Sequence, residues 1–308
     1  MTAATVTRPM TRIALSGTGP DWRGLLFQGF LLLCLVSTLL VLATLIADVV
    51  IKGAPVLAER GTDFLTSDMS NSAERSGVWQ GLVGSFVLAV IVALVAFPVG
   101  IATAIYLEEY AGESFLTRVI TVNIRNLAGV PSVVYGLLGL AVFVQLLGPL
   151  TGGRSVIAGG LTLAVLVLPI VIITSSEAIR AVPNSIREAG YGVGASRWEV
   201  VRGLVLPSAA PGILTGTVLS LSRALGETAP LILVGAAFGY FSTGRADFFQ
   251  QLFSSFTALP MIVFGWARLP QQSEWAPMTA AAIIVLLVVT LSINALAIYL
   301  RNRFERAW

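Results

Sequence analysis

The chain lacks histidine altogether, and its 308 residues include a single cysteine, Cys34. Without histidine, imidazole metal sites, Ser-His catalysis and imidazole proton relays are excluded. A single cysteine excludes an intrachain disulfide. We therefore predict neither a catalytic site nor a metal site in this chain.

Lysine is nearly absent as well. The one lysine, Lys52, is followed by Gly53. A phosphate-binding loop of the G-x-x-x-x-G-K-[ST] type needs a lysine before serine or threonine, so the chain has no ATP site of that type. If ATP drives this protein, another subunit binds it.

Charge of either sign is scarce. Only 11% of the residues are charged and 56% are hydrophobic, whereas soluble domains carry about 25% charged residues. This composition predicts an all-α polytopic membrane protein in contact with lipid. The net charge of +3 gives no reason to expect a nucleic-acid partner.

Six apolar runs approach the roughly 20 residues that a helix needs to cross a bilayer. The first is too long for a signal-peptide core, so we interpret it as an uncleaved anchor. Four prolines fall within runs and predict kinks or local loosening: Pro98, Pro131, Pro169 and Pro230. The runs are Leu25–Val50, Leu82–Tyr106, Leu127–Leu147, Val156–Thr174, Pro211–Ala237 and Pro277–Leu300.

The basic residues predict the orientation, because cytoplasmic loops carry the excess of arginine and lysine. Twelve cations fall on one side and six on the other, which places both termini in the cytoplasm and residues 51–80 outside. The majority side holds Arg8, Arg12, Arg23, Arg118, Arg125, Arg180, Arg187, Arg197, Arg202, Arg301, Arg303 and Arg306. The minority side holds Lys52, Arg60, Arg75, Arg154, Arg245 and Arg268.

Residues 239–275 contain apolar pieces that are too short to span. We expect a surface or re-entrant helix on the outer side, with Trp266 and Trp275 as interfacial anchors.

The segment 183–207 is too polar for the membrane and predicts two short cytoplasmic helices. Pro183 suits a first helical position, and glycines at 190, 192 and 194 break the chain. Ser196 and Glu199 match a capping box that starts a second helix, which we expect to stop by Pro207. Exposed apolar residues on such a knob favour docking to a partner groove, although an ordinary loop packed on its own domain is equally compatible.

This segment is similar to the "EAA" loop of ABC-importer permeases, whose pattern is E-A-A, three residues, G, nine residues and I-x-L-P. Gly190 replaces alanine and Leu204 replaces isoleucine. In that family the loop supplies the coupling helix that fits a cleft on the ATPase. The resemblance assigns this role to Glu188, Ala189, Gly194, Leu206 and Pro207.

Three further motifs resemble phosphate-transport permeases of the PstA type: FPVGIATAIYLEEYA (97–111), NLAGVPSVVYGLLGL (126–140) and RALGETAPLILVG (223–235). FTALP (256–260) also fits. The resemblance implies a type I importer core, MetI-like, over residues 81–300, with the coupling loop at 183–207. A tail (1–24), a first transmembrane helix (25–50) and an outer loop (51–80) precede the core, and a cytoplasmic tail (301–308) follows it.

The same resemblance implies the assembly, in the cytoplasmic (inner) membrane of a prokaryote. The expected partners are a second, PstC-like permease, two PstB-like ATP-binding subunits and a PstS-like phosphate-binding protein outside. ATP and magnesium would lie on the ATPase, with no cofactor on this chain. The pore subunit itself is then not an enzyme.

Arg223 and Glu227 lie within the fifth apolar run, four residues apart, so on a helix they share one face. Charges facing lipid cost a few kcal/mol each, so this face must meet protein or water. The pair is either a structural lock between helices or a substrate site. In the phosphate-permease family, the resemblance ties these two residues to transport.

Guanidinium donates paired hydrogen bonds to phosphate. Glutamate can accept one from a P–OH group, which sulfate lacks, or can simply orient the arginine. Ser222 and Thr228, like Ser220, are candidate oxyanion donors, with bonds to backbone carbonyls as the alternative for each.

Several alternative interpretations of single residues and of the function remain. Gly212 and Gly216 predict close helix packing, and Arg180 is a topology charge or an exit-path contact. An importer of sulfate or molybdate would share most features. An ion-coupled secondary transporter would leave the 183–207 knob unexplained. The absence of histidine and of an acidic pair within the spans argues against an intramembrane enzyme.

Overall fold

The computed structural model describes residues 22–112, 114–236 and 248–304, and all regular elements in these ranges are helices. Residues 1–21 of the predicted N-terminal tail, residues 305–308 of the predicted C-terminal tail and residues 237–247 lie outside these ranges. The longer elements are α1 (Trp22–Arg60), α3 (Trp79–Ile105), α4 (Phe115–Ala128), α5 (Ser132–Gly139), α7 (Val156–Arg180), α8 (Asn184–Gly192), α10 (Leu206–Gly226), α13 (Leu259–Trp266) and α14 (Gln272–Phe304). The shorter ones are α2 (Thr62–Thr66), η1 (Ala73–Arg75), η2 (Tyr106–Tyr110), η3 (Leu140–Leu146), α6 (Gly148–Thr151), α9 (Arg197–Val200), η4 (Val201–Val205), α11 (Ala229–Leu233) and α12 (Phe248–Leu252).

Five of these helices are long and apolar enough to cross a membrane, and a bent pair supplies a sixth if it counts as one span. The bent pair is Phe115–Ala128 with Ser132–Leu146, at an angle of 102°. The predicted run Leu127–Leu147 crosses this bend, and the kink predicted at Pro131 is confirmed. Pro131 explains the break, because proline disfavours helical backbone in the residue before it.

The chain divides into two compact units, Met1–Asp48 and Val49–Trp308. In the first, the described residues form the N-terminal part of α1, and nearly all of its side chains are exposed. The helix continues to Arg60, ten residues past the predicted end at Val50. The predicted outer loop 51–80 accordingly begins as helix, because no strong breaker precedes Gly61 and Pro55 is tolerated within it.

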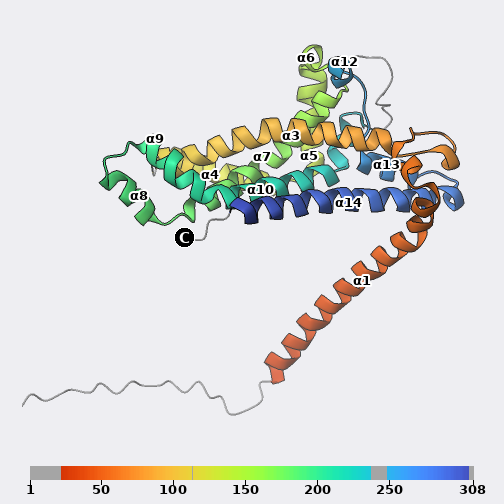
Figure 1. Cartoon of the computed structure of the whole chain (residues 1–308), viewed down its shortest axis with the longest axis horizontal. Coiled ribbons are helices and arrows are strands. Elements are labelled where there is room, and N and C mark those ends of the chain that lie inside the picture. The colour runs from red at the N-terminus through yellow and green to blue at the C-terminus, as the bar shows by residue number, and fades with distance from the viewer. Residues whose placement is uncertain (1–21, 113, 237–247, 305–308) are drawn as a thin grey trace, which may run out of the picture. The chain divides into compact units, whose positions relative to one another are not determined.

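In the second unit, α7 is the central helix and packs against α3 and α10 (Figure 1). The α10–α7 contact depends on two glycines. A Cβ atom on Gly216 would lie 2.3 Å from Thr174 Oγ1, and one on Gly212 would lie 2.8 Å from Ala178 Cβ. The predicted packing role of both glycines is thus confirmed.

Aromatic residues close one end of this unit. Trp266 and Trp275 have ring centroids 5.4 Å apart, and Phe64 lies 6.4 Å from Trp266. Both tryptophans are buried in a cluster with Met278 and Ala281. The prediction that they are interfacial anchors is therefore wrong, because side chains of α2, α13 and α14 pack around them.

The helices α8 and α9 lie at the end of the unit opposite α13 (Figure 1). The predicted capping box is present, with Ser196 and Glu199 bonded reciprocally. The prediction that the second helix stops by Pro207 is wrong, since one helix runs from Arg197 to Gly226. The π-helical turn η4 directly before α10 changes the hydrogen-bond register, which helps the helix to continue past a proline that has no N–H.

Candidate functional site

The predicted membrane charges lie at the point where α10 ends. Gly226 is the last helical residue, and Glu227 is extended, with φ −77° and ψ 123°. The next helix, α11, begins at Ala229 and has Pro230 in its first turn. A continuous helix would bring the ring of Pro230 against the carbonyl of Gly226, which favours a break here. The prediction that Arg223 and Glu227 share one continuous helical face is therefore wrong.

The two side chains nevertheless meet. A single long contact of 3.4 Å joins Arg223 Nε to Glu227 Oε1. The arginine side chain is 50% exposed and the glutamate 18%. Among the described residues, the two terminal guanidinium nitrogens have no hydrogen-bond partner. The pair is therefore weakly bound, and the terminal guanidinium nitrogens have hydrogen-bond donors available for an anion.

The neighbouring hydroxyl groups do not gather around Arg223. Ser222 is buried and lies 2.5 Å from Asn294 Oδ1 of α14, to which its Oγ donates. Ser220 donates to the carbonyl of Gly216 at 2.8 Å. Thr228 is half-buried at the helix break. Of the predicted set, the structure therefore brings together Arg223, Glu227 and the backbone around Thr228, while Ser222 links two helices.

The knob formed by α8 and α9 carries the second predicted site. Glu188 and Ala189 are exposed on α8, as is Pro207 on α10, and Leu206 is half-buried. Gly194 has φ +82°, a backbone conformation that favours glycine and allows the turn between the two helices. Tyr191, Val193 and Trp198 are also exposed, so the knob presents large apolar groups that the described part of the chain leaves uncovered.

The two departures from the EAA pattern touch one another. A Cβ atom on Gly190 would lie 2.9 Å from Leu204 Cδ1 and 2.8 Å from Val200 Cγ2. Gly190 is buried where α8 packs on η4. The glycine at position 190, which is smaller than alanine, thus leaves room for the longer leucine branch at position 204.

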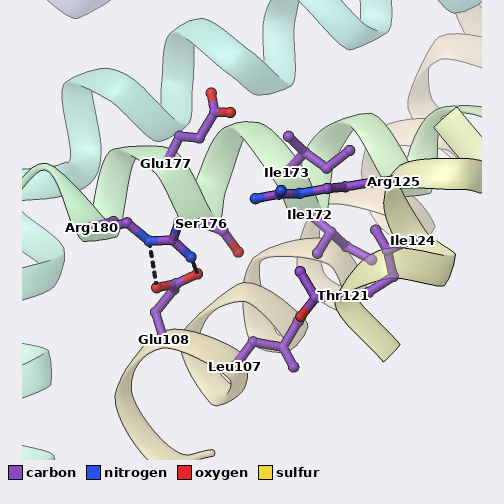
Figure 2. Close-up of a pocket in the computed structure, with 10 residues that line it drawn as sticks. All are labelled: Leu107, Glu108, Thr121, Ile124, Arg125, Ile172, Ile173, Ser176, Glu177 and Arg180. Carbon is purple, nitrogen blue, oxygen red and sulfur yellow. Dashed lines mark hydrogen bonds and ion pairs between the residues drawn. The ribbon is translucent and has the colours of Figure 1, made fainter. Parts of the chain in front are cut away.

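Sequence reasoning assigned no role to the segment η2 at the end of α3, yet its charges organise the knob. Glu108 and Arg180 form a two-contact pair, with 2.7 Å from Nη2 to Oε1 and 3.1 Å from Nε to Oε2. Figure 2 shows this pair at a small pocket where Arg125 of α4 extends toward α7 and Glu177 points away from Glu108. Arg180 is 60% exposed, so the pair lies at the surface.

The next glutamate makes a buried pair. Arg187 of α8 donates to Glu109 Oε1 from Nη2 at 2.8 Å and from Nε at 3.1 Å. Arg187 also donates to the carbonyls of Val182 and Ile179, at 2.6 and 2.9 Å. Glu109 is 5% exposed and Arg187 17%. One guanidinium thus ties together η2, the end of α7 and α8.

Tyr110 completes the series, because the Arg197 guanidinium carbon lies 5.0 Å from the centroid of its ring. Three consecutive residues of η2 therefore contact α7, α8 and α9 in turn. The only signal in the sequence was the pair of adjacent glutamates after a long apolar run, and their partners lie more than 70 positions away in the chain.

In the described residues, five or six helices could span a membrane, a charged pair lies at a helix break and a knob exposes apolar side chains, which are features of polytopic membrane transport subunits. The family model of the binding-protein-dependent transport system inner membrane component matches residues 96–306. The chain belongs to this family of multi-pass permeases of ABC importers, which work with ATPase and substrate-binding partners.

Two named proteins and one solved structure are similar to this chain. The chain is 35% identical over 225 residues to the phosphate transport system permease protein PstA 1 of Mycobacterium tuberculosis (strain CDC 1551 / Oshkosh), covering 73% of this chain and 70% of that protein. It is 31% identical to PstA of Xylella fastidiosa (strain Temecula1), covering 82% and 84%. The fold resembles an inward-facing MetNI methionine ABC transporter, with TM-score 0.56 and 17% identity, covering 75% of this chain and 95% of that one.

Proposed function

We propose that this chain is the membrane-spanning permease subunit of an ATP-driven importer that moves inorganic phosphate across the cytoplasmic membrane. Two relatives that are identical to it at about a third of the aligned residues are named as phosphate transport permeases. The observation that carries the proposal within this chain is the half-exposed Arg223, held by one long contact at a helix break.

Arg223 is the residue that holds phosphate during passage. Its guanidinium is permanently charged and can donate two parallel hydrogen bonds to an oxyanion. A transport site must bind weakly enough to release its ligand. One arginine at a partly exposed position meets that requirement, and tight recognition is left to the binding protein outside the membrane.

Glu227 supplies selectivity. At neutral pH phosphate carries at least one proton, and a carboxylate can accept a hydrogen bond from that P–OH group. Sulfate has no such proton and would leave the carboxylate facing an anion without a hydrogen bond. Discrimination of this kind is strong because the wrong ligand leaves polar groups unpaired. Thr228, at the same break, is the nearest candidate for an additional donor.

The knob at 183–207 couples this chain to the ATPase. Its exposed surface includes Trp198 and the EAA residues Glu188 and Ala189. The helix that starts in the knob at Arg197 runs for 30 residues to the break beside Glu227, a length of about 45 Å at the usual rise per residue. A displacement of the docking surface can therefore reach the phosphate site along one helix.

The proposed assembly has four kinds of subunit: this chain, a second homologous permease, two ATP-binding subunits inside and a phosphate-binding protein outside. ATP and magnesium belong to the ATPase, and this chain binds no cofactor. The excess of basic residues on the knob side and near the C-terminus supports cytoplasmic placement of both ends.

The experiment is to reconstitute the assembled complex in liposomes and follow uptake of labelled phosphate and of labelled sulfate, each with its saturated binding protein. We expect phosphate to be imported and to stimulate ATP hydrolysis, with sulfate uptake lower by about a hundredfold. Glu227→Gln should narrow that gap, and Arg118→Ala, an exposed arginine on α4, serves as the charge control. Preferred import of sulfate by the wild type would overturn the proposal.

A further inference from the structure

The contacts of η2 raise the question of how the knob moves. A docking loop can be displaced in two ways: it can slide over the membrane helices, or it can move with them as one body. Only the second mode passes a displacement from the ATPase to α3 and α7, in addition to the path along the helix Arg197–Gly226. The arrangement of Glu109 and Arg187 bears directly on this choice.

The Glu109–Arg187 contact has the features of a rigid joint. Both charges are largely buried, and one carboxylate oxygen accepts two hydrogen bonds from the guanidinium. The remaining donors bind the carbonyls of Ile179 and Val182 and the side chain of Asn184. Every nitrogen of Arg187 is therefore engaged, and sliding would leave buried donors without acceptors, which is strongly unfavourable.

Apolar packing surrounds the joint. Ala104 of α3, Ile179 of α7, and Val200 and Val205 of the helix that follows α8 form one buried cluster. The ends of the membrane helices and the base of the knob thus share a core. The apolar cluster resists separation, and the ion pair fixes the register, because a buried ion pair is satisfied in only one alignment.

We propose that Glu109 and Arg187 are positioning residues that lock the knob to the ends of α3 and α7, so that an ATP-driven displacement of the knob moves those helices. This inference rests on the proposed function, since it assigns the joint a role in coupling. Neither residue contacts the substrate. The neighbouring Glu108–Arg180 pair has the same chemistry at the surface and gives a matched control.

The test measures phosphate imported per ATP hydrolysed by the reconstituted complex. For Glu109→Gln and Arg187→Lys we expect this ratio to fall at least tenfold while the ATPase still assembles and turns over. The exchange Glu109→Arg with Arg187→Glu should recover part of the loss. Glu108→Gln and Arg180→Gln should stay within about twofold of the wild type, since exposed pairs contribute little.

A second readout does not depend on the substrate. Spin labels at Tyr106→Cys on η2 and Ser185→Cys on α8, in a Cys34→Ser background, report the spread of distances between knob and core in the complex. We expect a narrow distribution in the wild type and with Glu108→Gln, and a broad one with Glu109→Gln. Because this measurement needs no phosphate, a wrong substrate assignment would leave its result intact.

Three results would overturn the inference. One is a fall of uptake and ATP hydrolysis in equal proportion, which means that the pair supports only assembly or folding. Another is an unchanged distance distribution in Glu109→Gln. The third is failure of even the conservative Arg187→Lys variant to form a complex, because the pair would then be a requirement of the fold.

Discussion

Two arginine–glutamate pairs in this chain use the same chemistry for different ends. Arg223 and Glu227 share one contact of 3.4 Å, and the arginine is half-exposed. Arg187 and Glu109 share two shorter contacts in a buried setting, with carbonyl bonds besides. The loose pair retains unpaired donors, whereas every guanidinium nitrogen of the tight pair has an acceptor. This difference in burial and donor saturation is the reason why we propose a ligand site for the first pair and a joint for the second.

The largest expected effect is the difference in the free energy of unfolding between variants of the Glu109–Arg187 pair and of the Arg223–Glu227 pair. Arg187→Ala leaves Glu109 buried and unpaired, so we expect a loss of about 3–5 kcal/mol in the free energy of unfolding. Arg223→Ala removes one exposed contact and should cost less than about 1 kcal/mol. Denaturation of both variants in the same detergent checks this. Equal losses would mean that Arg223 is also a structural lock.

A change beneath Arg223 tests whether its position depends on the packing of α10. In Gly216→Val, the new side chain would collide with Thr174, so we expect a cost of about 1–3 kcal/mol and reduced uptake. Gly29→Ala on α1 is the control, because its Cβ atom would meet open space. Normal uptake by a destabilised Gly216→Val would show that the site tolerates a shift of its helix.

A substitution at Ser222 tests whether this hydroxyl belongs to the proposed phosphate site at Arg223. In Ser222→Ala, the hydrogen bond to Asn294 is lost, and we expect a cost of about 1 kcal/mol with little change in phosphate uptake. Thermal unfolding and uptake measured on the same preparation separate the two effects. Loss of uptake with unaltered stability would place this hydroxyl in the substrate path instead.

The smallest expected effect comes from the exposed Glu108–Arg180 pair and shows how much burial contributes to the stability of an ion pair. Glu108→Gln weakens an ion pair with good geometry whose arginine is exposed, so we expect less than about 1 kcal/mol of destabilisation. The same substitution at Glu109 should cost clearly more, since the guanidinium of Arg187 would lose its buried counter-charge. Equal costs at the two adjacent positions would show that burial does not make the difference.

The sequence was sufficient for much of the fold. Apolar runs and scarce charge predict the spanning helices, and the capping box at Ser196 and Glu199 appears as expected. Gly212 and Gly216 predict a close helix contact that the structure confirms. These features depend on local patterns of about 4 to 20 residues, which a single chain displays directly.

Other features depend on contacts between distant segments. Arg187 meets Glu109, 78 positions away, and Ser222 meets Asn294, 72 positions away. The burial of Trp266 and Trp275 likewise depends on which helices cover them. The break at Glu227 was within reach of sequence reasoning, because Pro230 forbids a helical bond to Gly226. Hydropathy alone hides such a break inside one apolar run.

The central claim is that Arg223 holds the transported phosphate. Its most direct test is uptake of labelled phosphate by the assembled complex that carries Arg223→Ala, with Arg223→Lys and Arg118→Ala alongside. We expect Arg223→Ala to abolish uptake while the complex assembles and its thermal unfolding changes little, with Arg223→Lys intermediate and Arg118→Ala normal. Undiminished uptake by an assembled Arg223→Ala complex would contradict it.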